Sequence, residues 1–172
     1  GASVHREGGR GARRPPPFTE CPPAVTLGRS ADERLAERFA TALAAELRAV
    51  GINLDYAPVL DVHTNPANPV IGDRALADRA ELVASLGAVI IRALQAAGVA
   101  ACGKHFPGHG DTSVDSHEVL PVVEHERRRL DAVEFVPFRR AVVENLATIM
   151  TAHVLVPAID EARIASLSPA VV

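Results

Sequence analysis

The chain has 172 residues, 48% of them hydrophobic and 23% charged, which is the balance of a soluble globular domain. A formal net charge of −3 argues against a chain-wide nucleic-acid or membrane footprint, and no apolar run reaches the roughly 18 residues of a membrane span. Cys21 and Cys102 form no CxxC pair, so we expect ordinary thiols in a reducing compartment. The opening GASVHR lacks the apolar segment of a signal peptide, so we expect a cytoplasmic protein.

The first part of the chain is predicted to be a loop followed by a helix. The opening residues are basic (Arg6, Arg10, Arg13, Arg14), which indicates either a solvated loop or one that faces an anion or a sugar. Residues 11–23 are rich in proline, which predicts an irregular connection. Ser30 is the expected N-cap of a helix that ends near Gly51. Its apolar residues recur every fourth position: Leu35, Phe39, Leu43 and Leu47.

Strands and helices then alternate. Residues 52–62 and 99–106 are short apolar runs typical of buried strands, each followed by a loop rich in Gly, Pro or Asn. A helix capped by Asp78 is expected between them, ending near Gly98. A third helix is predicted from about Leu130 to Asn145, followed by a strand over residues 147–156. This order favours βαβ units and a parallel sheet whose two faces are covered.

Ionisable residues follow the predicted strands: Asp61, His63, Lys104, His105, His109 and His153. Barrels of the (β/α)8 type and open α/β sheets place their active sites there. No GxGxxG motif follows the first strand, which argues against a nucleotide-binding Rossmann domain.

The densest cluster runs from Lys104 to His117, and we take residues 103–121 as a candidate catalytic loop. Asp115 precedes His117 by two residues and can fix the tautomer of its imidazole, which would then exchange protons near neutral pH. The alternative is a surface loop with satisfied hydrogen bonds. A metal-dependent hydrolase using His105, His109, Asp115 and His117 is disfavoured, because the spacing is not HExxH and Pro107 and Gly108 would break a helix.

The motif KHFPGHG followed by DSH resembles the signature of family 3 glycoside hydrolases, in their bacterial β-N-acetylglucosaminidase branch. Further segments agree in order and spacing: EGGR, NLDYAPVLDV, IGDR, TAHVLVPAID and LSPAVV. The resemblance covers nearly the whole chain. It implies an α/β fold, a partial (β/α)8 TIM barrel with roughly strands 2 to 5 and their helices, so that residues 1–172 form an incomplete N-terminal barrel domain.

The resemblance also implies residue roles. Lys104, His105 and Arg74 would bind the N-acetylglucosamine of a small amino-sugar glycoside, together with Arg13 if the EGGRxxR segment aligns without gaps. His117 would be the general acid/base and Asp115 its partner, in place of one of the two usual carboxylates. His109 is expected to shape the loop. The activity would be retaining hydrolysis of β-linked N-acetylglucosamine from peptidoglycan fragments in cell-wall recycling, with no cofactor or metal; phosphate in place of water stays open.

The chain departs from the family pattern in two respects. His5 stands where the family has an aspartate that contacts the sugar. No aspartate matches the motif of the nucleophile, which in the family lies on a strand after the LSPAVV segment. We therefore expect a partial barrel with open sheet edges, prone to self-association and inactive alone. A non-catalytic remnant that keeps part of the sugar pocket is the alternative.

Overall fold

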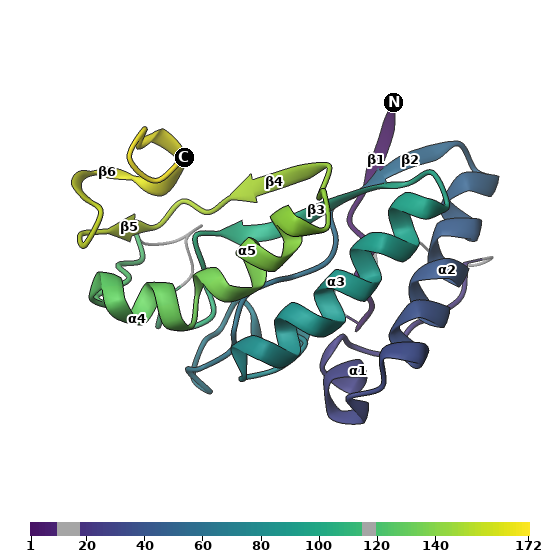
Figure 1. Ribbon diagram of the computed structural model, residues 1–172, viewed down its shortest axis with the longest axis horizontal. Helices are drawn as coiled ribbons and strands as arrows, with labels where there is room; N and C mark the ends of the chain where they lie inside the picture. The colour runs from purple at the N-terminus through teal and green to yellow at the C-terminus, as the bar shows by residue number, and fades with distance from the viewer. Residues whose placement is uncertain (10–17, 115–119) are drawn as a thin grey trace.

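The computed structural model describes residues 1–9, 18–114 and 120–172 (Figure 1). Its main sheet has four parallel strands in sequential order: β1 (Ala2–Val4), β2 (Ile52–Asp55), β3 (Ala100–Phe106) and β4 (Thr148–Thr151). Parallel strands in chain order, each joined to the next through helices, are the arrangement of a (β/α)8 barrel. The predicted fold, a partial barrel, is therefore confirmed.

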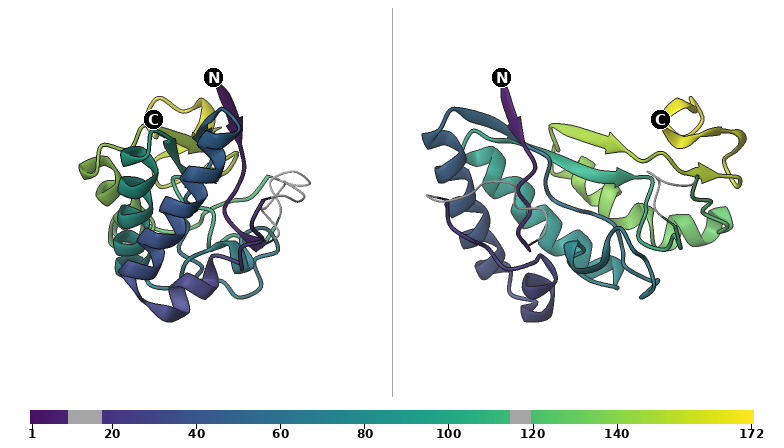
Figure 2. Two further views of the ribbon diagram at one scale, coloured as in Figure 1. Left: turned by 90° about the vertical axis from the view of Figure 1, so that its right-hand side faces the viewer. Right: turned by 180° about the vertical axis from the view of Figure 1, so that it is seen from behind.

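The helices lie along one face of this sheet, as the end-on view shows (Figure 2). They are α1 (Val25–Ser30), α2 (Glu33–Ala49), α3 (Ala80–Ala96), α4 (Arg127–Ala132) and α5 (Phe135–Val143), with 3-10 turns η2 (Gly72–Arg74) and η3 (Ala165–Leu167). The main apolar core forms where α2, α3 and α5 pack on one another and on the strands. No helix in the described part of the chain is long and apolar enough to cross a membrane.

The predicted first helix forms as α2, with a different cap and a different buried face. Asp32 is the N-cap, and its carboxylate accepts from the backbone N–H groups of Arg34 and Leu35 at 2.9 and 3.2 Å. The expected cap, Ser30, instead ends the unpredicted helix α1, where its hydroxyl donates to the Leu27 carbonyl. Leu35 is 37% exposed. The buried stripe consists of Ala36, Ala40, Leu43, Ala44 and Leu47, and its small alanines allow close packing.

Two other helix predictions need correction. The second helix begins at Ala80 with Arg79 as N-cap, so Asp78 lies one residue too early to cap it. The predicted third helix is two helices, α4 and α5, separated at Val133 and Glu134. Pro137 accounts for the break, because its ring would clash with the carbonyl of residue 133, four positions earlier.

The strand predictions hold in position but not in length. β2 ends at Asp55, and residues 57–60 then continue beside β3, where the Leu60 N–H donates to the Lys104 carbonyl at 2.6 Å. The last predicted strand divides into β4 and β5 (Leu155–Val156), and β5 pairs with the unpredicted β6 (Asp160–Ile164) in an antiparallel hairpin. The polar site lies in the loops that follow the carboxyl ends of the parallel strands β1, β2 and β3.

Candidate functional site

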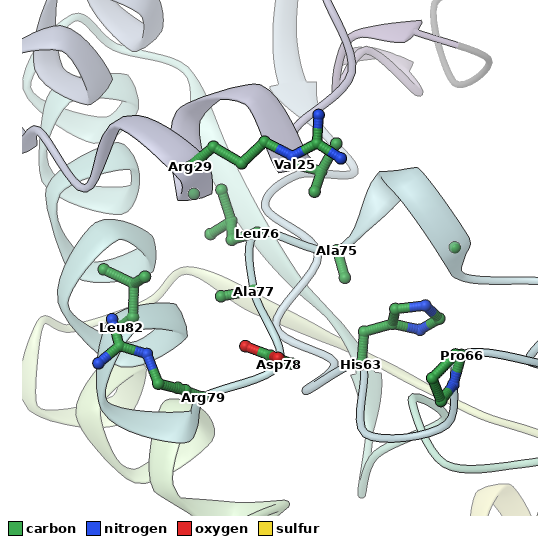
Figure 3. A pocket seen from close by; sticks show the side chains of 12 residues that line it. Val25, Arg29, His63, Pro66, Ala75, Leu76, Ala77, Asp78, Arg79 and Leu82 are labelled. Atoms are coloured by element: carbon green, nitrogen blue, oxygen red, sulfur yellow. The ribbon is translucent and has the colours of Figure 1, made fainter.

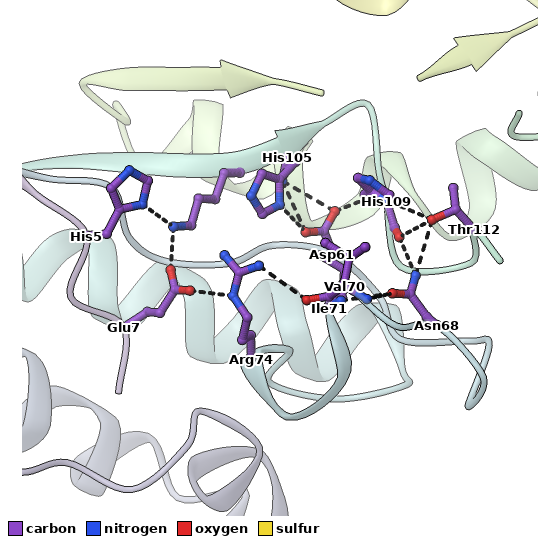
Figure 4. A network of polar contacts seen from close by, with 11 residues as sticks. His5, Glu7, Asp61, Asn68, Val70, Ile71, Arg74, His105, His109 and Thr112 are labelled. Atoms are coloured by element: carbon purple, nitrogen blue, oxygen red, sulfur yellow. Dashed lines mark hydrogen bonds and ion pairs between the residues drawn. The ribbon is translucent and has the colours of Figure 1, made fainter. Parts of the chain in front are cut away.

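Two cations and one buried carboxylate meet where β1 and β3 end (Figure 4). Glu7 follows β1 and is 6% exposed; one of its carboxylate oxygens accepts from Arg74 Nε at 2.6 Å, and the other pairs with Lys104 Nζ. Lys104 lies on β3 and is fully buried. Arg74 comes from η2, in the loop after β2, and also donates to the Val70 carbonyl. Glu7 therefore fixes both cations relative to each other.

Burial and charge act in opposite directions on this group. Burial alone would raise the pKa of the Glu7 carboxyl, but Lys104 and Arg74 outweigh it and hold that pKa below its usual range. Burial lowers the pKa of the Lys104 ammonium, and the neighbouring Glu7 opposes the shift. An ionised Glu7 is the condition under which both cations can stay inside the protein.

His5 forms a second contact of the Lys104 ammonium, beside that with Glu7. Its Nδ1 lies 3.3 Å from Lys104 Nζ, and its ring centroid lies 4.6 Å from that of Tyr56. Because β1 and β3 are not adjacent in the sheet, the Lys104 side chain reaches across β2 to meet His5 and Glu7. The residue that departs from the family pattern thus touches a residue expected to bind the sugar.

Asp61 is a second buried carboxylate, and it organises the KHFPGHG segment. It is fully buried and accepts from the backbone N–H of His109 at 2.7 Å, from the backbone N–H of His105, and from Nδ1 of the His105 ring at 2.7 Å. Burial would raise the pKa of the Asp61 carboxyl, but His105 and these hydrogen bonds lower it below its usual value. With Nδ1 turned to Asp61, the His105 ring has a defined orientation and presents Nε2 on its other side.

His109 is held inside the loop rather than displayed by it. It is 2% exposed; its carbonyl accepts from Asn68 Nδ2 at 2.7 Å and its Nδ1 contacts the Thr112 hydroxyl. Gly110 lies against the preceding loop so closely that a Cβ there would be 2.0 Å from the Val62 carbonyl oxygen. The loops after β2 and β3 are therefore packed as one unit.

Asp55, at the end of β2, is fully buried, as Asp61 is. One oxygen accepts from the Arg6 backbone N–H at 2.9 Å, while the other has no hydrogen-bond partner among the described residues. Burial raises the pKa of Asp55 to about 7, against the opposing effects of the Arg6 hydrogen bond and of Lys104. Asp55 thus changes charge near neutrality beside the ammonium that contacts His5 and Glu7.

A further ion pair ties the loop after β3 to the segment before α4. His125 Nε2 lies 2.6 Å from an Asp111 oxygen, and the other Asp111 oxygen accepts from the Thr64 hydroxyl. Arg129 donates to Thr64 and to Glu134. Asp111, in the described part of the predicted catalytic loop, is in this way held against the loop after β2.

The structure brings together Lys104, His105 and Arg74, three of the residues predicted to form the site. Arg13, Asp115 and His117 lie outside the described residues. The prediction did not include Glu7, Asp61 and Asp55 as site residues, although Glu7 belongs to the EGGR motif and Asp61 follows a predicted strand. The signal that could have found them is a carboxylate within an apolar or glycine-rich segment, which needs a partner when buried.

Within the described ranges, no group of three or more His, Cys, Asp or Glu side chains is arranged to hold a metal ion. A separate pocket of about 390 Å³ lies beside the loop that carries Arg74, and Arg29, His63 and Asp78 are among its lining residues (Figure 3). None of Glu7, Lys104 and His105 lines it. This pocket is therefore distinct from the polar network.

The fold and the site together define a domain of the (β/α)8 class with a buried polar network at the carboxyl ends of its strands. The family described as "Glycosyl hydrolase family 3 N terminal domain" matches residues 2–172, and the chain belongs to this family. The family resemblance inferred from the KHFPGHG and DSH motifs is thereby confirmed.

Individual relatives agree with the family. The chain is 45% identical over 170 residues to a beta-hexosaminidase of Methylococcus capsulatus, covering 97% of this chain and 50% of that protein. A family 3 β-N-acetylglucosaminidase from Paenibacillus sp. superposes with a TM-score of 0.97 at 49% identity, over 99% of this chain and 32% of that one. NagZ from Neisseria gonorrhoeae, in complex with N-trifluoroacetyl-D-glucosamine, superposes with a TM-score of 0.90 at 39% identity. The match covers 96% of this chain and 50% of that one. The chain thus spans about half the length of the curated Methylococcus relative.

Proposed function

We propose that this chain forms the N-acetylglucosamine-binding part of a retaining β-N-acetylglucosaminidase. The observation that carries the proposal is the buried Glu7 carboxylate, which holds Lys104 and Arg74 side by side at the carboxyl ends of the strands. The relatives named as beta-hexosaminidase and β-N-acetylglucosaminidase support the reaction, and the N-trifluoroacetyl-D-glucosamine bound to the Neisseria protein supports the sugar.

The proposed sugar contacts follow from the hydrogen-bond donors and acceptors that Lys104, Arg74 and His105 present. A lysine ammonium has three N–H groups and no lone pair. Among the described residues, two of the N–H groups of Lys104 are taken up by Glu7 and His5, so a third can bind a ring hydroxyl. Arg74 uses Nε for Glu7 and Nη1 for the Val70 carbonyl, and its outer N–H groups would bind a neighbouring hydroxyl. His105 donates its Nδ1–H to Asp61, so Nε2 of the neutral ring would accept from a sugar hydroxyl. Arg13 is the fourth proposed contact.

The proposed chemistry uses Asp115 and His117 as an acid/base dyad. A neutral imidazole can deprotonate water, and an imidazolium can protonate the leaving oxygen. Retaining hydrolysis also needs a carboxylate nucleophile. We do not propose Asp55, Asp61 or Asp160 for that role: the first two are fully buried, and Asp160 accepts from the Ser168 hydroxyl and from the backbone of its own turn. We therefore propose that the 172-residue chain binds the sugar without turning it over.

The proposed setting is the cytoplasm, where the enzyme would remove β-linked N-acetylglucosamine from peptidoglycan fragments during cell-wall recycling. The proposed ligand is a small amino-sugar glycoside, and neither a nucleic acid nor a membrane surface is a proposed partner. The net charge of −3 supports that restriction.

The test is a titration of the full chain with N-acetylglucosamine, followed by isothermal calorimetry and by amide shifts in NMR, with glucose as the comparison sugar. Arg74→Gln should weaken binding at least 10-fold, because a hydrogen bond from a charged group contributes about 1.5–3 kcal/mol. Arg128→Gln, an exposed change on α4, is the matched control and should bind as the wild type does. Absence of binding, or equal binding by Arg74→Gln, would contradict the proposal.

Turnover is tested separately with 4-nitrophenyl N-acetyl-β-D-glucosaminide. We expect no release of nitrophenol by the isolated chain. Release that disappears in His117→Ala would show that the chain carries a complete active site. Binding without turnover is also the result expected of a non-catalytic remnant. The DNA immediately after the codon for Val172 separates the two: a reading frame that continues into a strand with the nucleophile motif favours the enzyme.

A further inference from the structure

The contact between His5 and Lys104 restricts the protonation state of His5. His5 Nδ1 and Lys104 Nζ are 3.3 Å apart, which is within hydrogen-bond reach. An ammonium can only donate, so in this contact Nδ1 must supply the lone pair. A neutral imidazole with a free lone pair on Nδ1 carries its proton on Nε2.

We infer that His5 is a positioning residue for Lys104. As a neutral acceptor, His5 holds the Lys104 ammonium toward the proposed sugar site. Protonation of His5 releases the ammonium, so sugar binding weakens as His5 becomes charged. The second half of this inference rests on the proposed function, because it takes N-acetylglucosamine as the ligand of Lys104. The first half concerns the chain alone.

The geometry makes the contact sensitive to charge. Protonation of His5 would place an N–H on Nδ1 against the N–H groups of the ammonium, and two like charges about 3 Å apart inside a protein repel strongly. The Lys104 side chain is fully buried and cannot turn to water. Its remaining anchor is Glu7, so the ammonium would be drawn toward that carboxylate and away from His5.

Other charged groups lie around His5 and Lys104, and their effects on the pH dependence of binding must be distinguished from that of His5. Glu7 and Arg74 lie on the far side of the ammonium, and Asp55 on β2 acts on it electrostatically. Tyr56, after β2, stacks on the His5 ring. Burial raises the pKa of Asp55 to about 7, so Asp55 also changes charge between pH 7.5 and pH 5.5. A pH effect on binding therefore needs a variant at each position.

The first measurement needs no ligand. Long-range ¹H–¹⁵N NMR of the full chain at pH 7.5 distinguishes a protonated from an unprotonated Nδ1. We expect Nδ1 of His5 to be unprotonated and Nε2 to carry the proton. A ring protonated on Nδ1 at this pH would overturn the inference, whether or not the chain binds a sugar.

The second measurement is the dissociation constant for N-acetylglucosamine at pH 7.5 and 5.5. If only the neutral form of His5 supports binding, affinity for the sugar falls from pH 7.5 to pH 5.5 in proportion to the loss of that form. His5→Gln supplies an amide oxygen that accepts from Lys104 without titrating, so its affinity should change less than about 2-fold. Asp55→Asn should keep the decrease of the wild type.

The outcomes separate the two proposals. A decrease that persists in His5→Gln and disappears in Asp55→Asn would assign the effect to Asp55 and overturn the role of His5 in binding. No binding at either pH contradicts the proposed function, while the NMR result still decides whether His5 is the acceptor of Lys104. Circular dichroism at both pH values confirms that each variant is folded.

Discussion

Replacing Asp55 by asparagine should stabilise the protein more at pH 8 than at pH 5. The pKa of Asp55 is raised from 3.8 to about 7, a shift of about three units at about 1.4 kcal/mol each, or roughly 4 kcal/mol in all. Between about pH 4 and pH 7 the folded state keeps a proton that the unfolded state has lost. Stability therefore falls as the pH rises through this window. From pH 5 to pH 8 the loss of stability due to Asp55 is roughly 2–3 kcal/mol.

Asparagine fits the same space and keeps an oxygen for the Arg6 N–H, but it does not ionise. The assay is urea unfolding followed by circular dichroism at pH 5 and pH 8. The difference in unfolding free energy between wild type and variant should shift by roughly 2–3 kcal/mol in favour of Asp55→Asn at the higher pH. Asp78→Asn, an exposed change in the loop before α3, should show no such shift. An equal effect of Asp55→Asn at both pH values would show that Asp55 is already ionised at pH 5.

Three further changes test other parts of the structure. Asp61→Ala removes the acceptor of two backbone N–H groups and of the His105 ring, so the free energy of unfolding should fall by about 3 kcal/mol. Urea titrations measure this change, and Asp160→Ala should lower the free energy of unfolding by less. Asp32→Ala removes the cap of α2 and should cost about 1 kcal/mol, measured in the same way. β1 and β4 are the edge strands of the described sheet, so we expect the chain to self-associate, as measured by light scattering after size exclusion. Ile149→Lys on β4 should reduce the association. An unchanged mass of this variant would show that the β4 edge is not the contact.

The fold was predictable from the sequence because apolar strands and amphipathic helices alternate along it. The positions of β2, α2, α3 and β3 followed from that pattern alone. Boundaries that depend on tertiary structure were not predictable. Leu35 continues the periodicity of its helix but lies near solvent, because alanines form the surface that packs on α3. Pro137 is the signal in the sequence for the break between α4 and α5, which apolar periodicity alone does not indicate.

The site was predictable in its cations and not in its anions. Lys104, His105 and Arg74 were assigned to the site because the family resemblance gives them roles. Glu7, Asp55 and Asp61 also lie in family segments, but their importance comes from burial, which the sequence does not display. His5 is a similar case. The sequence showed that it replaces an aspartate of the family pattern, but only the folded chain shows that its Nδ1 meets Lys104.

Taken together, the charges around Lys104 explain why a histidine is tolerated at position 5. Lys104 and Arg74 share the single carboxylate of Glu7, and below pH 7 the neighbouring Asp55 is mostly uncharged. A neutral His5 adds a hydrogen-bond acceptor without a second negative charge, so the pair of cations keeps an excess positive charge that can act on ligand oxygens. An ionised aspartate at position 5 would satisfy Lys104 more strongly and leave less of that charge to the ligand. His5→Asp should therefore stabilise the buried ammonium and raise the temperature of unfolding at pH 7.5, where His5→Gln should not. Calorimetric scans of the two variants decide the point, and a His5→Asp variant that melts below His5→Gln would refute this account of the pocket.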